Sequence, residues 1–181
     1  MARLPYPAAD EMLDSVAREV AKFPPLNLIR MMAHSGELFG PWYRVASAIL
    51  NEGALPPLLR EISILRVAAL SPGADYERTQ HEAIARELGM SEEQIAGALS
   101  GRGLTGDDEL VSEFTEQVVL NVSPSEETWD RLVPRFTPRQ IIELLMVIGQ
   151  YMTVARIAAT TGIELDPPVG TALFDALSDG S

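Results

Sequence analysis

The sequence predicts an all-α protein that folds as a single-domain helical bundle. Apolar residues recur with helical spacing over nearly the whole chain, and no segment shows sustained alternation of polar and apolar residues. Proline, glycine and capping residues stand at the ends of these apolar segments, where helices begin and stop. The 181 residues are enough for one domain with a substantial core.

Five helices are expected in the first half of the chain. Two prolines at positions 24 and 25 end the first of them, because proline cannot continue the backbone ladder. Pro57 starts the fourth at its first turn, and Gly89 follows the fifth as a C-terminal cap. The expected ranges are 8–23, 26–33, 41–50, 57–70 and 75–88.

The second half carries clear capping signals. Ser91 with Gln94 and Thr137 with Gln140 are capping boxes, in which each side chain satisfies a free backbone N–H of the new helix. Gly162 ends the last long helix. The expected helices follow Ser91 and cover 107–122, 124–135 and 138–160. Ser123 is the expected cap of the helix at 124–135, with Pro124 at its first position. The tail is expected to hold a short turn of helix at 171–177 or to be disordered.

We divide the chain into an N-terminal helical extension (1–26), a helical domain (27–165) and a C-terminal tail (166–181). The segments 55–61 and 137–143 resemble each other, since each brings proline and then glutamate before an apolar helix. This similarity indicates two partly related halves.

The composition of the chain argues against several kinds of partner and reaction. The formal net charge is -12, which argues against nucleic acid and anionic membranes as partners, because both require a surplus of lysine and arginine. No uninterrupted apolar run reaches the length of a membrane span, so we expect a cytoplasmic protein. The chain has no cysteine and two histidines, so neither thiol chemistry nor a dedicated metal site is expected.

Three polar residues on the two central helices are candidates for chemistry. Glu77 and His81 stand four residues apart and therefore face each other one helical turn apart. Glu61 lies on an apolar face, where a carboxylate needs a partner. A carboxylate beside an imidazole suits a general acid/base, although such a pair is also common as a purely structural contact.

These residues carry a resemblance to a known family. The segment 60–68, which begins with Arg60-Glu61, and the segment 75–81, which contains Tyr76-Glu77 and ends in His81, resemble the carboxymuconolactone decarboxylase family, which includes the alkylhydroperoxidase D-like proteins. The resemblance extends over about 27–165. It implies an alkylhydroperoxidase D-like helical fold and a homo-oligomer, either a trimer or an assembly of trimers or dimers.

The family that the chain resembles has two branches with different chemistries. In the alkylhydroperoxidase-like branch, a Cys-x-x-Cys motif precedes the histidine, and counting back from His81 places those cysteines at Ala74 and Glu77. Neither residue is a thiol, so the chain is not expected to be a thiol peroxidase. The glutamate of that branch falls at Ile62 by strict count, and one extra residue in the loop 71–74 assigns its role to Glu61.

The decarboxylase-like branch implies a cofactor-independent reaction on a small carboxylated or lactone-type metabolite. His81 is then the general acid/base, Glu77 orients it, and Glu61 is a second proton relay. Tyr76 and Arg66 are candidates for substrate binding, and the alternatives are a packing role for Tyr76 and an interhelix salt bridge for Arg66. A decarboxylase, an isomerase or a related lyase fits this site, and so does a cyclase or dehydratase step in secondary metabolism. A non-catalytic oligomeric binding protein that keeps the fold is the alternative.

The expected site is an apolar pocket between the helices at 57–70 and 75–88. Its expected walls are Leu58, Ile62, Leu65 and Ile84. Trp129 and Tyr151 are expected in the core.

Overall fold

The computed structural model describes residues 1–174, which form nine α-helices and two short 3-10 helices. No strand occurs in this part of the chain, so the predicted all-α fold is confirmed. The α-helices are α1 (Asp14–Val20), α2 (Asn27–Met32), α3 (Phe39–Asn51), α4 (Pro57–Leu70), α5 (Asp75–Glu87), α6 (Glu92–Ser100), α7 (Gly106–Asn121), α8 (Glu126–Leu132) and α9 (Pro138–Thr161). The 3-10 helices are Ala9–Glu11 and Ala33–Leu38.

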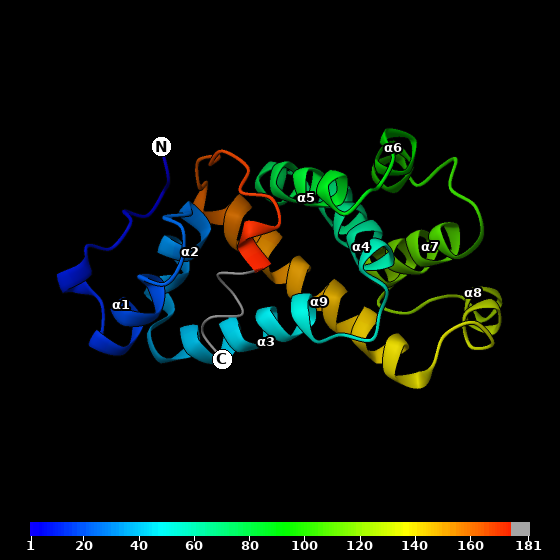
Figure 1. Cartoon of the computed structure of the whole chain (residues 1–181), viewed down its shortest axis with the longest axis horizontal. Coiled ribbons are helices and arrows are strands. Elements are labelled where there is room, and N and C mark those ends of the chain that lie inside the picture. Colours follow the sequence, from blue (N-terminus) through cyan, green and yellow to red (C-terminus); the bar gives the residue numbers. More distant parts are fainter. Residues whose placement is uncertain (175–181) are drawn as a thin grey trace.

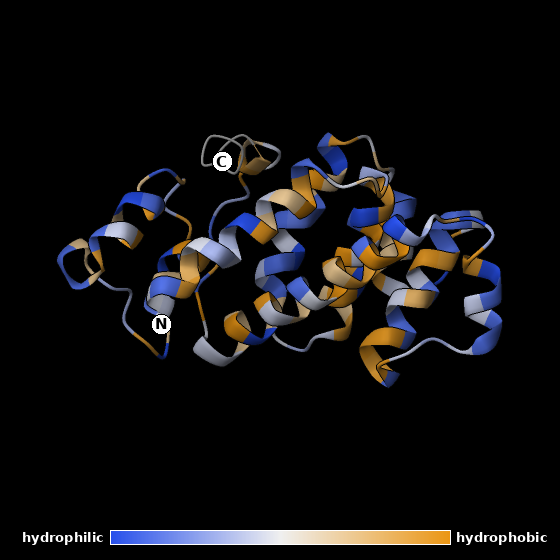
Figure 2. Ribbon diagram, turned by 90° about the horizontal axis from the view of Figure 1, so that it is seen from below, coloured by the Kyte–Doolittle hydropathy of each residue, from blue (hydrophilic) through white to orange (hydrophobic). Residues whose placement is uncertain are grey.

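Helix α4 is the centre of the bundle. Its residues from Leu59 to Ala68 are all buried, and it packs against α5, α6, α7 and α9. Helices α1 and α2 lie at one end of the elongated molecule and α6 to α8 at the other, while α9 runs between them (Figure 1). Hydrophobic residues gather where the helices of the bundle cross (Figure 2). A helix buried on all sides presents several apolar faces, so its periodicity alone does not show which one borders a site.

The capping signals at Ser91, Thr137 and Gly162 fix the helix ends as expected, whereas the cap expected at Ser123 is wrong. Ser125 caps α8 instead, and its side chain accepts a hydrogen bond from the Thr128 N–H. The Ser91 side chain accepts a hydrogen bond from the Gln94 N–H, and Thr137 accepts one from the Gln140 N–H. Gly162 has φ 63°, the left-handed conformation that glycine adopts without a steric penalty.

The first predicted helix, 8–23, is wrong as a continuous helix. The structure has a 3-10 turn at Ala9–Glu11, extended backbone at Met12, and then α1. Leu13 stands at the N-cap of α1 and offers no side chain that accepts a hydrogen bond from the first turn.

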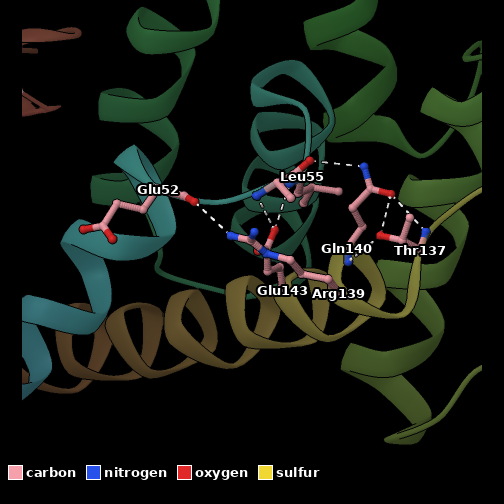
Figure 3. A network of polar contacts seen from close by, with 7 residues as sticks. Glu52, Leu55, Thr137, Arg139, Gln140 and Glu143 are labelled. Carbon is pink, nitrogen blue, oxygen red and sulfur yellow. Dashed lines mark hydrogen bonds and ion pairs between the residues drawn. The ribbon is translucent and has the colours of Figure 1, made fainter.

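The start of α9 is tied to the loop before α4 (Figure 3). Glu143 Oε2 accepts hydrogen bonds from the backbone N–H groups of Ala54 (2.7 Å) and Leu55 (2.8 Å). Arg139 donates to the Glu52 carbonyl and also pairs with Glu143. These contacts fix the start of α9 against the loop that leads into α4, the helix that carries Glu61.

Residues 165–174 form a strap that crosses α5, and we call this segment the C-terminal strap. Asp166 Oδ2 accepts hydrogen bonds from the Tyr76 hydroxyl (2.7 Å) and from the Asn27 N–H (2.6 Å). The Gln80 side chain accepts from the Val169 N–H, and Glu87 accepts from Thr171. Residues 172–174 are helical, and the remainder of the turn predicted at 171–177 lies outside the described residues.

In the described residues, α9 is the helix that is long and apolar enough to cross a membrane by length and composition. Of its apolar window, 44% is buried inside the bundle. A core helix of a globular protein has the same length and composition, so this helix is weak evidence for a membrane span.

Candidate active site

His81 lies between two glutamates in the interior of the bundle. Its Nδ1 atom is 2.7 Å from Oε2 of Glu61, and its Nε2 atom is 3.6 Å from Oε2 of Glu77. The first distance is a hydrogen bond, whereas the second is too long for one. His81 is 2% exposed and Glu61 is 0% exposed, so water does not compete for the bonded pair. The structure therefore brings together the three residues that were predicted to be catalytic.

Arg60 supports Glu61 from the other side. Its Nε atom donates to Glu61 Oε1 at 3.2 Å, and its Nη1 atom donates to the Leu50 carbonyl at 2.8 Å. Both oxygens of Glu61 are thus engaged, one with a guanidinium and one with an imidazole. This arrangement fixes the orientation of the imidazole ring, and Nδ1 carries the proton when it donates to the carboxylate.

Glu77 is buried without a full set of partners. Its Oε1 atom is buried and has no hydrogen-bond partner within the described residues. Burial raises the pKa of the Glu77 carboxyl above its usual range, and nearby Glu61 raises the pKa further, while His81 lowers it. A carboxyl in this environment can hold a proton at a pH at which an exposed glutamate has lost it.

Tyr151 of α9 completes the surroundings of the histidine. Its ring meets the His81 ring edge to face, with centroids 4.8 Å apart. Burial raises the pKa of its hydroxyl well above the usual value, and the charges of Glu61 and Glu77 raise it further. Tyr151 therefore stays neutral and restricts the movement of the imidazole.

A small cavity of about 60 Å³ adjoins this cluster. It is lined by residues from α2, α3, α5 and α9 and by Leu173 of the C-terminal strap. His81, Glu77, Tyr76 and Tyr151 are among the lining residues.

The predicted pocket between α4 and α5 is therefore wrong in its position. Leu58, Ile62, Leu65 and Ile84 do not line the cavity. Three of the four are fully buried core residues, because α4 is surrounded by helices and its apolar faces are filled by their side chains. The cavity lies where His81 and Glu77 of α5 meet side chains of α2, α3 and α9.

Comparisons with known proteins agree with this architecture. A crystal structure described as an alkylhydroperoxidase AhpD core, an uncharacterized peroxidase-related protein from Ralstonia eutropha JMP134, superposes with a TM-score of 0.78 at 16% identity, covering 96% of this chain and 94% of the other. An uncharacterized peroxidase-related protein from Silicibacter sp. TM1040 superposes with a TM-score of 0.77 at 16% identity, covering 97% and 95%. These similarities establish the alkylhydroperoxidase D-like fold. Comparison with curated proteins finds no match.

The central part of the sequence is similar to a known family. The model of the carboxymuconolactone decarboxylase family matches residues 36–115, which include Glu61, Glu77 and His81. The matched segment contains α4 and α5, which carry all three residues.

The two predicted substrate-binding residues of this carboxymuconolactone decarboxylase-like domain lie in different places. Tyr76 lines the cavity, but its hydroxyl donates to Asp166, so it anchors the C-terminal strap. Arg66 does not reach the cavity. Its guanidinium pairs with Glu116 of α7 at 2.6 Å and donates to the Leu99 carbonyl. Substrate binding is therefore wrong for Arg66, and the alternative, an interhelix salt bridge, is confirmed.

Helix geometry explains where Arg66 points. Five residues separate it from Glu61, which rotates its direction by roughly 140° around α4. Glu61 points to His81 on α5, whereas Arg66 points toward α6 and α7. Trp129, predicted in the core, is 40% exposed on α8, and the prediction for Tyr151 as a buried residue is confirmed.

Sequence reasoning missed three residues of the site. Arg60 precedes Glu61 directly, and a buried carboxylate required a partner of this kind. Trp42 of α3 lines the cavity, and its Nε1 atom is buried with no hydrogen-bond partner in the described part of the chain. Gln80 lines the cavity as well and holds the C-terminal strap, and its position one turn after Tyr76 was the available signal.

The described residues contain no group of three or more histidine, aspartate or glutamate side chains arranged to hold a metal ion. In the cluster, Glu61 and Glu77 contact different nitrogens of the imidazole ring.

Replacing Glu77 with glutamine is expected to stabilise the protein at neutral and higher pH. Because the folded-state pKa of Glu77 exceeds the ordinary value of 4.5, the folded protein binds more protons than the unfolded chain between these two values. Stability therefore falls as the pH rises through this window, and glutamine, which does not titrate, avoids the loss. The free energy of unfolding, measured by urea denaturation over a pH series, checks this.

The expected gain is absent below pH 4.5, where the carboxyl is protonated in both states. Glu93→Gln serves as the control, since Glu93 is an exposed glutamate at the start of α6. A Glu77→Gln variant that is less stable than the parent at pH 8 contradicts the assignment of a raised pKa.

Proposed function

We propose that this protein is a cofactor-independent acid/base enzyme in which His81 transfers a proton on a small carboxylated or lactone-type metabolite. The observation that carries the proposal is the hydrogen bond of 2.7 Å between His81 Nδ1 and Glu61, which leaves Nε2 without a hydrogen-bond partner beside the cavity. A decarboxylase, an isomerase or a related lyase is the reaction class that this arrangement supports.

The roles of the residues follow from the contacts. Glu61, held by Arg60, accepts the Nδ1 proton and stabilises the imidazolium that forms when Nε2 takes a proton from substrate. Glu77, whose pKa is raised by burial, lies next to Nε2 and can return or receive that proton. The surrounding apolar side chains exclude water and strengthen each of these electrostatic contacts.

The names of the structural neighbours raise peroxide chemistry as a second possibility for the fold. Both are described as peroxidase-related. Thiol-dependent peroxide reduction needs a cysteine thiolate as the nucleophile, and this chain contains no cysteine. We therefore assign no thiol step to this protein.

A non-catalytic oligomeric binding protein is the alternative outside enzymology. In that case the Glu61–His81–Glu77 cluster would only hold α4 and α5 together. The distance of 3.6 Å between His81 Nε2 and Glu77 argues for catalysis, because a purely structural histidine in the interior is expected to hold both nitrogens at hydrogen-bond distance. A cyclase or dehydratase step uses the same proton transfers and belongs to the same proposal.

The test is a turnover assay on small lactones and carboxylated lactones. Incubation in deuterium oxide, followed by NMR, detects exchange of protons next to a carbonyl, double-bond migration and loss of carbon dioxide. We expect turnover of at least one compound by the parent protein and none above background by His81→Gln. Turnover that persists in His81→Gln contradicts the proposal. A cytoplasmic location, a small-molecule substrate and the absence of a cofactor stay predictions.

We also propose that the chain assembles into a homo-oligomer through α9. Ile142, Leu145, Met146 and Gly149 follow helical spacing and form one face of α9. Ile142 is 57% exposed and Met146 is 48% exposed, which is unusual for two large apolar side chains on adjacent turns. A second subunit packed on this face would remove the apolar surface from water.

Replacing Ile142 with glutamate is therefore expected to shift the assembly toward monomer, because the change places a charge in an apolar interface. Size-exclusion chromatography with light scattering measures the mass in solution. Val122→Glu is the matched control, since Val122 is 87% exposed at the end of α7, away from this face. A parent protein that is monomeric at micromolar concentration contradicts the proposal.

A further inference from the structure

Two buried polar atoms around the cavity have no partner. Nε1 of Trp42 is a hydrogen-bond donor and Oε1 of Glu77 is an acceptor, and neither forms a hydrogen bond within the described residues. Both residues line the same cavity. Leaving a buried polar atom unsatisfied is costly, so such atoms are rare in folded proteins. A ligand in the cavity that carries an accepting oxygen can satisfy the Trp42 donor.

The cavity has no positive charge to receive a carboxylate. Its charged or titratable lining consists of Glu77 and His81, with the tyrosines 43, 76 and 151, and no lysine or arginine of the described residues contributes. The seven residues beyond them contain no lysine, arginine or histidine. A free carboxylate bound here would lie beside Glu77 in an apolar enclosure, which is electrostatically unfavourable.

The two arginines of α4 already have partners within the protein. Arg60 donates to Glu61 and to the Leu50 carbonyl, and Arg66 pairs with Glu116 and Leu99 on another side of the helix. His81 is itself compensated by Glu61, at 2.7 Å. None of these cations is available to a ligand in the cavity, although Arg and Lys are the side chains that normally bind carboxylates.

We infer that the substrate of this site is an uncharged carbonyl compound, such as a lactone, ketone or ester, whose carbonyl oxygen accepts a hydrogen bond from Trp42 Nε1. The inference rests on the proposed acid/base function and narrows its substrate class. It excludes free carboxylates as substrates, and it therefore excludes the decarboxylation of an ionised acid as the reaction.

The residues present are sufficient for the isomerisation of an uncharged carbonyl compound by proton transfer. His81 Nε2 removes a proton from the carbon next to the carbonyl, so that a C–H bond breaks and an N–H bond forms. The electron pair moves into a carbon–carbon double bond, and the carbonyl π electrons move to oxygen to give an enolate. Trp42 Nε1 stabilises this oxygen by donating its hydrogen bond. Return of the proton to the same or a conjugated carbon completes an isomerisation without any other reactant.

Size restricts the substrate further. A cavity of about 60 Å³ accommodates a small molecule only, and ligand sites for drug-sized compounds are several times larger. Leu173 of the C-terminal strap forms part of the wall, so a larger substrate requires displacement of this segment. Small cyclic carbonyl compounds are therefore the appropriate probes.

The experiment compares matched neutral and ionised probes on the full chain. The pairs are γ-valerolactone with the hydroxypentanoate that its hydrolysis yields, and methyl cyclopentanecarboxylate with cyclopentanecarboxylate. Ligand-observed NMR titration gives the Kd of each. We expect the neutral member of at least one pair to bind and its ionised partner to bind more than about tenfold more weakly, because the site buries an unpaired charge.

Trp42→Phe keeps an aromatic ring and removes the N–H donor. It is expected to weaken binding of the neutral probe by about two- to tenfold, the usual contribution of one hydrogen bond. Trp129→Phe is the matched control, because Trp129 lies on α8, outside the cavity, and is the only other tryptophan of the chain. It is expected to leave the Kd unchanged.

Three results would overturn the inference. They are tighter or equal binding of the ionised probes, binding of neither neutral probe, and an unchanged Kd in Trp42→Phe. A different result would contradict the proposed function without contradicting this inference. If the neutral probes bind through Trp42 but the parent protein turns over none of the lactones in deuterium oxide, the substrate class stands as a ligand class and the acid/base role of His81 is wrong.

Discussion

Replacing His81 with glutamine is expected to lower kcat on the substrate by about 10²–10⁴-fold, the usual contribution of general acid/base catalysis. Glutamine keeps a similar size and can still donate to Glu61 Oε2, which is 2.7 Å from the histidine in the parent protein. It has no group that gains and loses a proton near neutral pH. The effect therefore falls on kcat, with a smaller effect on KM.

His34→Gln is the control for this experiment. His34 is the other histidine of the chain. Its Nε2 atom contacts the Pro5 carbonyl, away from the cavity. This variant is expected to keep the activity of the parent. Circular dichroism checks that both variants are folded. Activity of His81→Gln within about threefold of the parent contradicts the acid/base role, since such catalysis contributes at least two orders of magnitude.

Replacing Glu61 with leucine is expected to lower the free energy of unfolding by about 3–5 kcal/mol, because it leaves a buried charge without its partner. The charge is that of Arg60, which is 4% exposed and pairs with Glu61 at a distance of 3.2 Å. The Nδ1 atom of His81 also loses its acceptor. Urea denaturation measures the change.

The double variant Arg60→Met/Glu61→Leu separates the two causes. Apolar residues in place of both charges remove the unpaired guanidinium, and such replacements of buried ion pairs are often neutral or stabilising. Most of the lost stability should therefore return, apart from the part due to His81. A double variant that is no more stable than Glu61→Leu contradicts the view that Arg60 and Glu61 form one buried pair.

Helix boundaries could be predicted where local chemistry determines them. Ser91, Thr137 and Gly162 cap their helices through contacts with residues only a few positions away, and the sequence contains all of that information. The first helix, predicted at 8–23, lacked such a signal, because neither Met12 nor Leu13 offers a capping side chain.

The composition of the site could also be predicted, whereas its environment could not. The spacing of Glu77 and His81 places both on one face of α5, and burial of Glu61 required a partner. The position of the cavity depends on which helix covers which face of α5. That choice is made by tertiary contacts with α3 and α9, which bring Trp42 and Tyr151 to the site from distant parts of the sequence.

The tautomer of His81 tests the central claim most directly. Nitrogen NMR of isotopically labelled histidine in the parent and in His34→Gln, which leaves His81 as the only histidine, gives the protonation of each ring nitrogen. The structure predicts that in the neutral tautomer the proton lies on Nδ1, bonded to Glu61, and that Nε2, 3.6 Å from Glu77, carries none. In Glu61→Gln this preference for Nδ1 should weaken. A neutral His81 with its proton on Nε2 would contradict the account, because the nitrogen beside the cavity would then be unable to accept a proton from a substrate.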